Sequence, residues 1–277
     1  MLKQRIITAL VLLAILLPAM FYPASTPFEL VTVVLLGAAG WEWARLNGNG
    51  PKASLLIGLA LGAFLLAFAM LGGLNAQWPL VWAVVGVAWL VLAVVVLRRG
   101  VTGWTQWPRL LRLGLGIGLL ACAWLALVQA RQKGLGFLLS VLTLVWMADV
   151  AAYAGGKAFG KRKLAPSLSP GKSWEGALSG ALGVLLLAGG WIWADRHGWT
   201  DGSSLFSHLW AHGPLLALLA TLGLSAMSVC GDLIESLVKR SAGMKDSSQL
   251  LPGHGGVLDR VDALLPVLPL AMMLSQL

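Results

Sequence analysis

The sequence predicts an all-α integral membrane protein, a polytopic bundle of about nine transmembrane helices with a cytoplasmic N-terminus. Three observations support this prediction: an apolar composition, a series of long apolar segments and an uneven distribution of basic residues. Of the 277 residues, 58% are hydrophobic and only 11% are charged. A soluble domain has roughly 25% charged residues, because its surface faces water. We therefore expect lipid around most of this chain.

Long apolar segments recur along the whole sequence. A helix needs about 20 mostly apolar residues to cross a bilayer. About nine segments satisfy this requirement, at residues 6–22, 28–46, 53–73, 78–97, 111–130, 134–153, 174–194, 213–238 and 258–276. The first is longer than the apolar core of a signal peptide, and we interpret it as a retained helix. We expect a single membrane domain over residues 1–277.

The positions of Lys and Arg indicate the orientation, since cytoplasmic loops of membrane proteins are enriched in both. With a cytoplasmic N-terminus, the opposite side receives only Arg131, Lys133 and Arg196 of the 20 basic residues. The net charge of +9 therefore reflects topology and contacts with anionic membrane lipid. Nucleic acid is not an expected partner.

Polar residues are concentrated in the second half of the chain. The segments at about 155–173 and 239–258 are rich in Gly, Ser, Pro and Lys, and both are expected on the cytoplasmic side. Residues 1–133 are mostly apolar and are interpreted as scaffold helices. Residues 134–277 are expected to provide the catalytic helices and cytoplasmic loops.

Acidic residues within the apolar segments are candidates for function, because an ionised group in a membrane segment costs roughly 2.5–3.5 kcal/mol. The predicted topology brings six of them, from four segments, to the cytoplasmic side: Asp149, Glu175, Asp232, Glu235, Asp259 and Asp262. An ion pair with a nearby Lys or Arg is the alternative role for any one of them. Glu42, between Trp41 and Trp43, is instead expected to anchor its helix at the membrane interface.

The spacing of these residues predicts a metal site. One helix face collects four polar residues spaced i, i+3, i+4 and i+7, namely Asp232, Glu235, Ser236 and Lys239. Asp259 and Asp262 are likewise i, i+3 neighbours. Carboxylates that face one cavity repel each other unless a cation neutralises them. Hard oxygen ligands favour Mg²⁺, which is the expected cofactor, with a second cation left open.

The C-terminal part of the sequence resembles a known family. Residues 236–262 read SLVKRSAGMKDSSQLLPGHGGVLDRVD. This stretch resembles the signature of the phosphatidate cytidylyltransferases at its fixed positions, which are Ser236, Lys239, Arg240, Lys245, Asp246, His254, Gly255, Gly256, Asp259, Arg260 and Asp262. Residues 169–176 (SPGKSWEG) are similar to a second motif of that family. A third motif is matched by Asp149, Ala152, Tyr153 and Gly156.

The resemblance implies a Mg²⁺-dependent enzyme of bacterial type in the inner membrane, with its active site facing the cytoplasm. Its substrates would be CTP and phosphatidic acid, and its products CDP-diacylglycerol and pyrophosphate, in phospholipid biosynthesis. Asp232 and Asp259 match the family's metal ligands, with Ser236 and Lys239 as further catalytic residues. We add Asp262 as a third metal ligand, because it neighbours Asp259. Members of the family form dimers, so a homodimer is expected.

The chemistry of such a reaction agrees with these residues. A phosphate monoester has a second pKa near 6 and is largely dianionic at pH 7, so it needs no general base to attack. Positioning and charge neutralisation then dominate catalysis. The residues expected to bind substrate phosphates are Lys172, Ser173, Arg240, Lys245, His254, Gly255, Gly256 and Arg260. The glycines would let backbone N–H groups approach an anion.

Two other functions stay open at this point. A transporter or channel would have ionisable groups near the bilayer midplane, whereas the acids here are expected at one face. A related membrane enzyme would use CTP on another lipid phosphate or on a lipid alcohol. An assay with labelled CTP and several lipid acceptors separates these functions.

Overall fold

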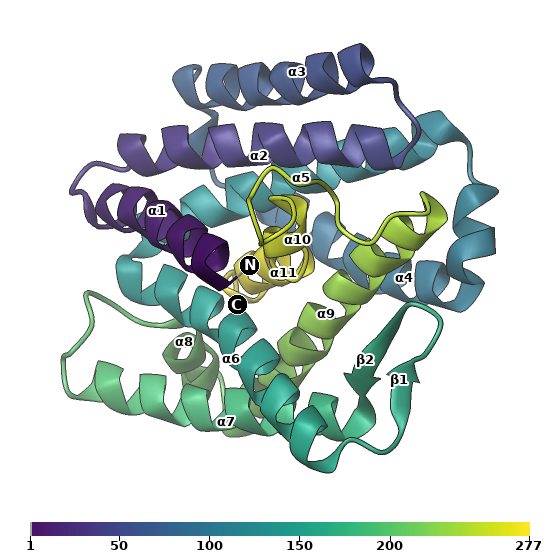
Figure 1. Cartoon of the computed structure of the whole chain (residues 1–277). Coiled ribbons are helices and arrows are strands. Elements are labelled where there is room, and N and C mark those ends of the chain that lie inside the picture. The colour runs from purple at the N-terminus through teal and green to yellow at the C-terminus, as the bar shows by residue number, and fades with distance from the viewer. Residues whose placement is uncertain (1) are drawn as a thin grey trace.

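The computed structural model describes residues 2–277, and about 77% of the chain is helical (Figure 1). The first helices are α1 (Leu2–Phe21), α2 (Thr26–Leu46), α3 (Pro51–Met70), α4 (Pro79–Thr105), α5 (Arg109–Lys133) and α6 (Leu135–Phe159), with a short 3-10 turn, η1 (Gly73–Asn75), before α4. The later ones are α7 (Trp174–Arg196), α8 (Leu205–Ala211), α9 (Pro214–Ser241), α10 (Leu258–Val261) and α11 (Leu264–Leu274). Two short strands, β1 (Lys163–Ala165) and β2 (Ser169–Ser173), separate α6 from α7.

Seven helices in residues 2–277 are long and apolar enough to cross a membrane: α1, α3, α4, α5, α6, α7 and α9. Their outer faces carry large apolar side chains, such as Leu59 (61% exposed) and Leu186 (72% exposed). Lipid rather than water solvates such a surface. The prediction of a helical, multi-pass membrane protein is confirmed.

Two of the predicted segments differ from these seven. Helix α2 has 21 residues but includes Glu29, Glu42 and Arg45, which lower its apolar character. The expected helix over 258–276 is interrupted, because the structure divides this segment into α10 and α11, although Asp262 and Ala263 between them keep right-handed helical dihedral angles. Pro266 explains the division, since it has no N–H to donate to the carbonyl of Asp262.

The core lies around α11, which packs against α4, α5 and α9 in the middle of the bundle (Figure 1). Val267, Leu268 and Met272 of α11 are buried there. Trp82 of α4 and Trp124 of α5 are fully buried in the same apolar cluster. The core therefore joins helices from both halves of the sequence.

Helices α6 and α7 are in close contact because glycines of α7 face α6. A Cβ on Gly176 would lie 2.8 Å from the carbonyl oxygen of Ala152, and one on Gly180 would lie 2.8 Å from that of Ala148. Residues four apart lie on the same side of a helix, so both glycines face α6. This packing places the C-terminal end of α6 beside the N-terminal end of α7.

A β-hairpin occupies the predicted loop between these helices. Strands β1 and β2 are antiparallel, with Lys163 opposite Ser173 and Ala165 opposite Ser169. Leu168 in the turn is buried, which anchors the hairpin on the bundle. The hairpin ends at Ser173, whose Oγ accepts a hydrogen bond from the Gly176 N–H (3.1 Å) and so caps α7.

Candidate active site

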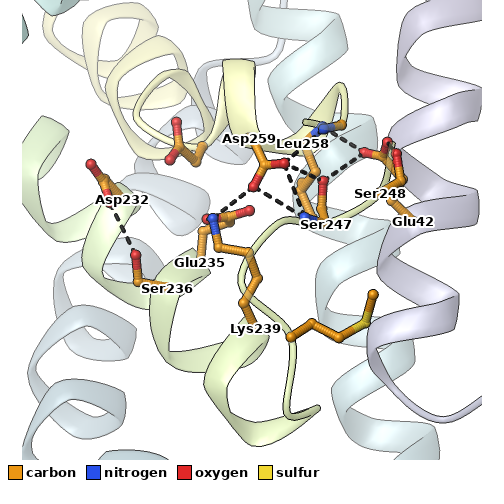
Figure 2. A network of polar contacts seen from close by, with 12 residues as sticks. Glu42, Asp232, Glu235, Ser236, Lys239, Ser247, Ser248, Leu258 and Asp259 are labelled. Carbon is orange, nitrogen blue, oxygen red and sulfur yellow. Dashed lines mark hydrogen bonds and ion pairs between the residues drawn. The ribbon is translucent and has the colours of Figure 1, made fainter. Parts of the chain in front are cut away.

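The predicted polar face of α9 is present in the structure. Asp232, Glu235, Ser236 and Lys239 follow each other along α9, with Glu235 and Lys239 toward the loop that leads into α10 and with Asp232 and Ser236 further from it (Figure 2). Ser236 Oγ donates a hydrogen bond to Asp232 Oδ1 (3.2 Å). The opposite faces of α9 carry buried apolar side chains such as Leu224 and Leu237. A polar stripe on a largely apolar helix indicates a polar cavity inside the protein.

The Lys239 ammonium lies between two buried carboxylates. It forms an ion pair with Glu235 one turn earlier, and its Nζ is 2.6 Å from Asp259 Oδ1 (Figure 2). The three side chains are 12%, 3% and 5% exposed, respectively. One ammonium therefore serves two carboxylates in a poorly solvated place. Within residues 2–277, Oε1 of Glu235 is buried and has no hydrogen-bond partner.

Asp259 also binds the loop at residues 242–257, which we call the α9–α10 loop. Its carboxylate accepts hydrogen bonds from the Ser247 N–H (2.9 Å), Ser247 Oγ (3.0 Å) and the Gly256 N–H (2.7 Å). The loop is thereby folded back over the start of α10. Asp259 thus connects the α9 stripe to the middle and to the C-terminal end of this loop.

Glu42 of α2 binds the same loop from the other side. Its side chain is fully buried, and its carboxylate accepts hydrogen bonds from Ser248 Oγ (2.5 Å), Leu258 N–H (2.6 Å) and Val257 N–H (3.0 Å), while Ser247 Oγ (3.2 Å) shares its single proton between Glu42 and Asp259 (Figure 2). A carboxylate has about four acceptor sites, so most of them are used. The expectation that Glu42 anchors its helix at the membrane interface is wrong.

Two glycines of the loop fit against these carboxylates. A Cβ on Gly256 would lie 2.3 Å from Glu42 Oε1, and one on Gly255 would lie 2.5 Å from Asp259 Oδ2. Gly255 also has a positive φ of 83°, which disfavours other residues. Both positions therefore require glycine for the loop to reach its two acidic partners.

A second acidic group lies next to the first. Asp149 of α6, Asp232 of α9 and Asp262, which follows α10, are close enough to interact electrostatically. Lys172 of β2 reaches this group, with its Nζ 2.6 Å from Asp232 Oδ2. The side chains of Lys172 and Asp232 are 24% and 31% exposed, so water reaches them. Water therefore reaches the second acidic group, whereas the ion pairs of Lys239 with Glu235 and Asp259 are nearly closed to water.

The other predicted residues lie around these two groups. Arg240 has weak contacts, at 3.4 Å, with the carbonyl oxygens of Leu168 and Met244. Lys245 and Arg260 are exposed, and the Nδ1 atom of His254 is buried without a partner in residues 2–277. The other five predicted acids belong to the two acidic groups, whereas the carboxylate of Glu175 binds Arg162 Nε (3.0 Å) at the start of the hairpin.

The amino-acid sequence is similar to those of known proteins over nearly its whole length. The model of the cytidylyltransferase family matches residues 3–277. The chain belongs to this family. It is 42% identical over 275 residues to a Pseudomonas aeruginosa protein named phosphatidate cytidylyltransferase, with 97% of this chain and 95% of the relative covered. A Haemophilus influenzae protein of the same name is 38% identical over 294 residues, covering 97% of this chain and 96% of the relative. The resemblance found in residues 236–262 is confirmed.

The acidic groups of this cytidylyltransferase suit Mg²⁺, although they do not form a complete cage. Within residues 2–277, no three His, Cys, Asp or Glu side chains converge as a metal site by themselves. Proteins usually hold Mg²⁺ through one or two carboxylates, with phosphate oxygens and water filling the other positions. The unpartnered Glu235 Oε1 and the Asp149–Asp232–Asp262 group provide such carboxylates.

The sequence analysis missed the role of Glu42 in binding the α9–α10 loop. One property could have identified it: an acid inside a predicted membrane segment is a candidate for function wherever it occurs. The contact itself joins residues more than 200 positions apart, such as Glu42 and Ser247, so no local pattern reports it.

Replacing Glu42 by Gln tests its role in the cytidylyltransferase. The Gln amide group places its N–H donors opposite the N–H of either Val257 or Leu258, which can only donate, so at least one hydrogen bond is lost at a cost of about 1–3 kcal/mol. We expect a lower unfolding temperature and kcat/KM reduced by about 100-fold or more. Glu29→Gln, on the same helix, is the control and should behave as the wild type. Wild-type activity in Glu42→Gln would show that these contacts do not position the loop.

Proposed function

We propose that this protein transfers the cytidylyl group of CTP to phosphatidate, giving CDP-diacylglycerol and pyrophosphate. The observation that carries the proposal is the similarity to proteins named phosphatidate cytidylyltransferase over 97% of the chain. The carboxylates and lysines around α9 support it, because the lysines, and a divalent cation held by the carboxylates, would neutralise phosphate charge. The proposed role lies in phospholipid biosynthesis.

The reaction forms one P–O bond and breaks another. A phosphate oxygen of phosphatidate attacks the α-phosphorus of CTP, and the bond to the bridging oxygen of pyrophosphate breaks. The attacking phosphate is already largely dianionic at pH 7, so its proton needs no acceptor. Fixed cations must instead hold the two anionic substrates together.

Basic residues around the acidic groups are proposed to bind the phosphates. Lys172 is partly exposed and paired with Asp232, so it can turn to a phosphate while remaining in the site. Lys239 is nearly buried and keeps Glu235 and Asp259 in place. The further proposed phosphate ligands are Ser173, Arg240, Lys245, His254, Gly255, Gly256 and Arg260, and Ser236 is proposed to orient Asp232.

Asp232, Asp259 and Asp262 are proposed to hold Mg²⁺ together with phosphate oxygens of CTP, and a second cation is part of the proposal. When bound, the metal would neutralise charge that develops on the phosphates. Asp259 now accepts hydrogen bonds from Lys239, Ser247 and Gly256, so a cation at this carboxylate must replace at least one donor. Asp232 and Asp262 have fewer donors to lose.

The proposed setting is a bacterial inner membrane, with nine crossings, a cytoplasmic N-terminus, a cytoplasmic active site and a homodimeric assembly. The seven apolar helices support a multi-pass membrane protein, and the bacterial relatives support an inner membrane. Concentration of Lys and Arg on one side supports the orientation. CTP is a soluble cytoplasmic metabolite, so it reaches the site only from that side.

Two alternatives have less support. A related enzyme that uses CTP on another lipid phosphate or a lipid alcohol fits the membrane setting equally well, but the names of the relatives favour phosphatidate. A transporter fits less well, because the family model and the names of the relatives indicate cytidylyl transfer.

The proposed activity is tested directly with purified protein in detergent micelles and CTP labelled at the α-phosphate. We expect label in CDP-diacylglycerol when phosphatidate is present, an equal amount of pyrophosphate, and no product after chelation of divalent cations. Diacylglycerol and other lipid phosphates are the comparison acceptors. Product formed only from one of those acceptors would contradict the proposal.

The orientation is tested by single cysteines in a background that lacks Cys122 and Cys230. Lys163→Cys in the hairpin and Gly202→Cys between α7 and α8 are both at exposed positions. An impermeant thiol reagent should label the first only from the cytoplasmic side and the second only from the opposite side. Labelling of both cysteines from one side would overturn the proposed topology.

A comparison of Lys239→Met with His254→Gln separates charge neutralisation from proton transfer. Lys239→Met leaves two buried carboxylates without their cation, and breaking such a pair costs about 3–5 kcal/mol. We expect at least a 1,000-fold loss of kcat from it. His254→Gln should lose only about 10–100-fold, at the low end of general-acid effects. Lys157→Met, at an exposed position of α6, is the control. An inactive His254→Gln beside a mildly slowed Lys239→Met would show that proton transfer limits the reaction.

A further inference from the structure

An apolar groove runs between α2 and α3, outside the acidic groups. It has a volume of about 510 Å³. Its lining is almost entirely apolar and includes Val34, Gly37, Leu59, Gly62 and Ala63. The two helices lie side by side at one edge of the bundle (Figure 1).

Glycines account for the shape of this groove. A Cβ on Gly58 would lie 2.6 Å from the Gly37 carbonyl oxygen, so the helices touch at this point. One turn further along α3 the space opens, because a Cβ on Gly62 would meet only Val33 Cγ1, at 3.8 Å. The absence of side chains at these positions leaves a channel between the helices.

A polar cavity of about 570 Å³ lies at one end of the groove. In the proposed topology this end faces the cytoplasm. It is lined by Trp41 and Arg45 of α2 and by residues 244–246 and 248–250 of the α9–α10 loop. The Arg45 guanidinium lies 4.8 Å from the centre of the Trp41 ring. Arg45 and Lys245 contribute two positive charges and Asp246 one negative charge, so the cavity has a net positive charge.

The groove and the cavity are adjacent. Trp41 and Leu250 line both of them. From Trp41 to Val33 the groove follows α2 for eight residues, which is about 12 Å. The combined surface is apolar within the membrane and cationic at its cytoplasmic end. This is the complement of a lipid with an acyl chain and an anionic phosphate headgroup.

The cavity is also adjacent to the reacting groups. Asp246 lines it, and a Cβ on Gly255 would lie 3.5 Å from Asp246 Cβ and 2.5 Å from Asp259 Oδ2. Ser248, another lining residue, binds Glu42 (2.5 Å). A phosphate in the cavity would therefore be separated from Asp259 by the α9–α10 loop alone.

We propose that the groove between α2 and α3 docks phosphatidate, with an acyl chain between the helices and its phosphate at Arg45 and Lys245. The proposal rests on the proposed function for the identity of the lipid. It gives the first half of the chain a role in substrate acquisition. The lipid reaches the site from within the bilayer, while CTP enters from water.

A matched pair of α3 variants tests the apolar part. Ala63→Leu places a larger side chain in the groove, whereas Ala60→Leu adds the same side chain at an exposed position that does not line it. Overfilling a binding surface should raise the KM for phosphatidate about tenfold in Ala63→Leu, with the KM for CTP unchanged. Ala60→Leu should match the wild type. Equal behaviour of the two variants would overturn the proposal.

A binding measurement that needs no turnover complements the kinetics. Phosphatidate with a photoreactive group on its acyl chain is irradiated with the purified protein in the absence of CTP. Cross-links should map to residues 33–41 and 55–66, fall about tenfold in Arg45→Gln, and be outcompeted by phosphatidate but not by phosphatidylcholine. Cross-links at other positions would overturn the docking site. A change of oligomeric state in Ala63→Leu would also overturn it, because the groove would then be a subunit contact. A protein that cross-links as expected but forms no CDP-diacylglycerol would contradict the proposed function instead.

Discussion

The buried carboxylate of Glu42 determines the position of the loop on which the candidate active site depends. Its hydrogen bonds reach the middle of the α9–α10 loop, at Ser247 and Ser248, and the junction of the loop with α10, at Val257 and Leu258. An ionised group in this place would be strongly destabilising without such partners. Conversely, the loop's donors would be unsatisfied without Glu42. Each therefore requires the other, and α2 becomes part of the site.

The same loop connects Glu42 to the charges of α9. Ser247 binds both Glu42 and Asp259, and Asp259 in turn binds Lys239. A network of buried polar contacts thus extends from α2 to α9, and its members keep one another in place. It retains more carboxylates than cations, which suits a site that receives Mg²⁺ and basic side chains together with triphosphate and lipid phosphate. The groove between α2 and α3 ends beside this network, so the lipid and the nucleotide would meet at the loop.

Much of this arrangement could be predicted from the sequence, and the rest could not for physical reasons. The stripe from Asp232 to Lys239 follows from helical spacing, and residues 236–262 indicated the family. The break before α11 was not predicted, because the segment is apolar enough for one helix. It occurs where Pro266 removes a hydrogen bond to Asp262. The hairpin at 163–173 has no strong alternation of apolar residues. Glu42 was misassigned because its partners lie at the far end of the chain, and only tertiary structure brings them together.

Hydrogen exchange of the segment 251–260 tests the central claim, that Glu42 positions the α9–α10 loop, most directly. In the wild type, the amides of Val257 and Leu258 are bonded to Glu42 and should exchange slowly, whereas those of exposed residues such as Gln249 should exchange fast. In Glu42→Gln the segment 251–260 should exchange as fast as the exposed part of the loop, with α9 still protected. Unchanged slow exchange in this variant would contradict the claim.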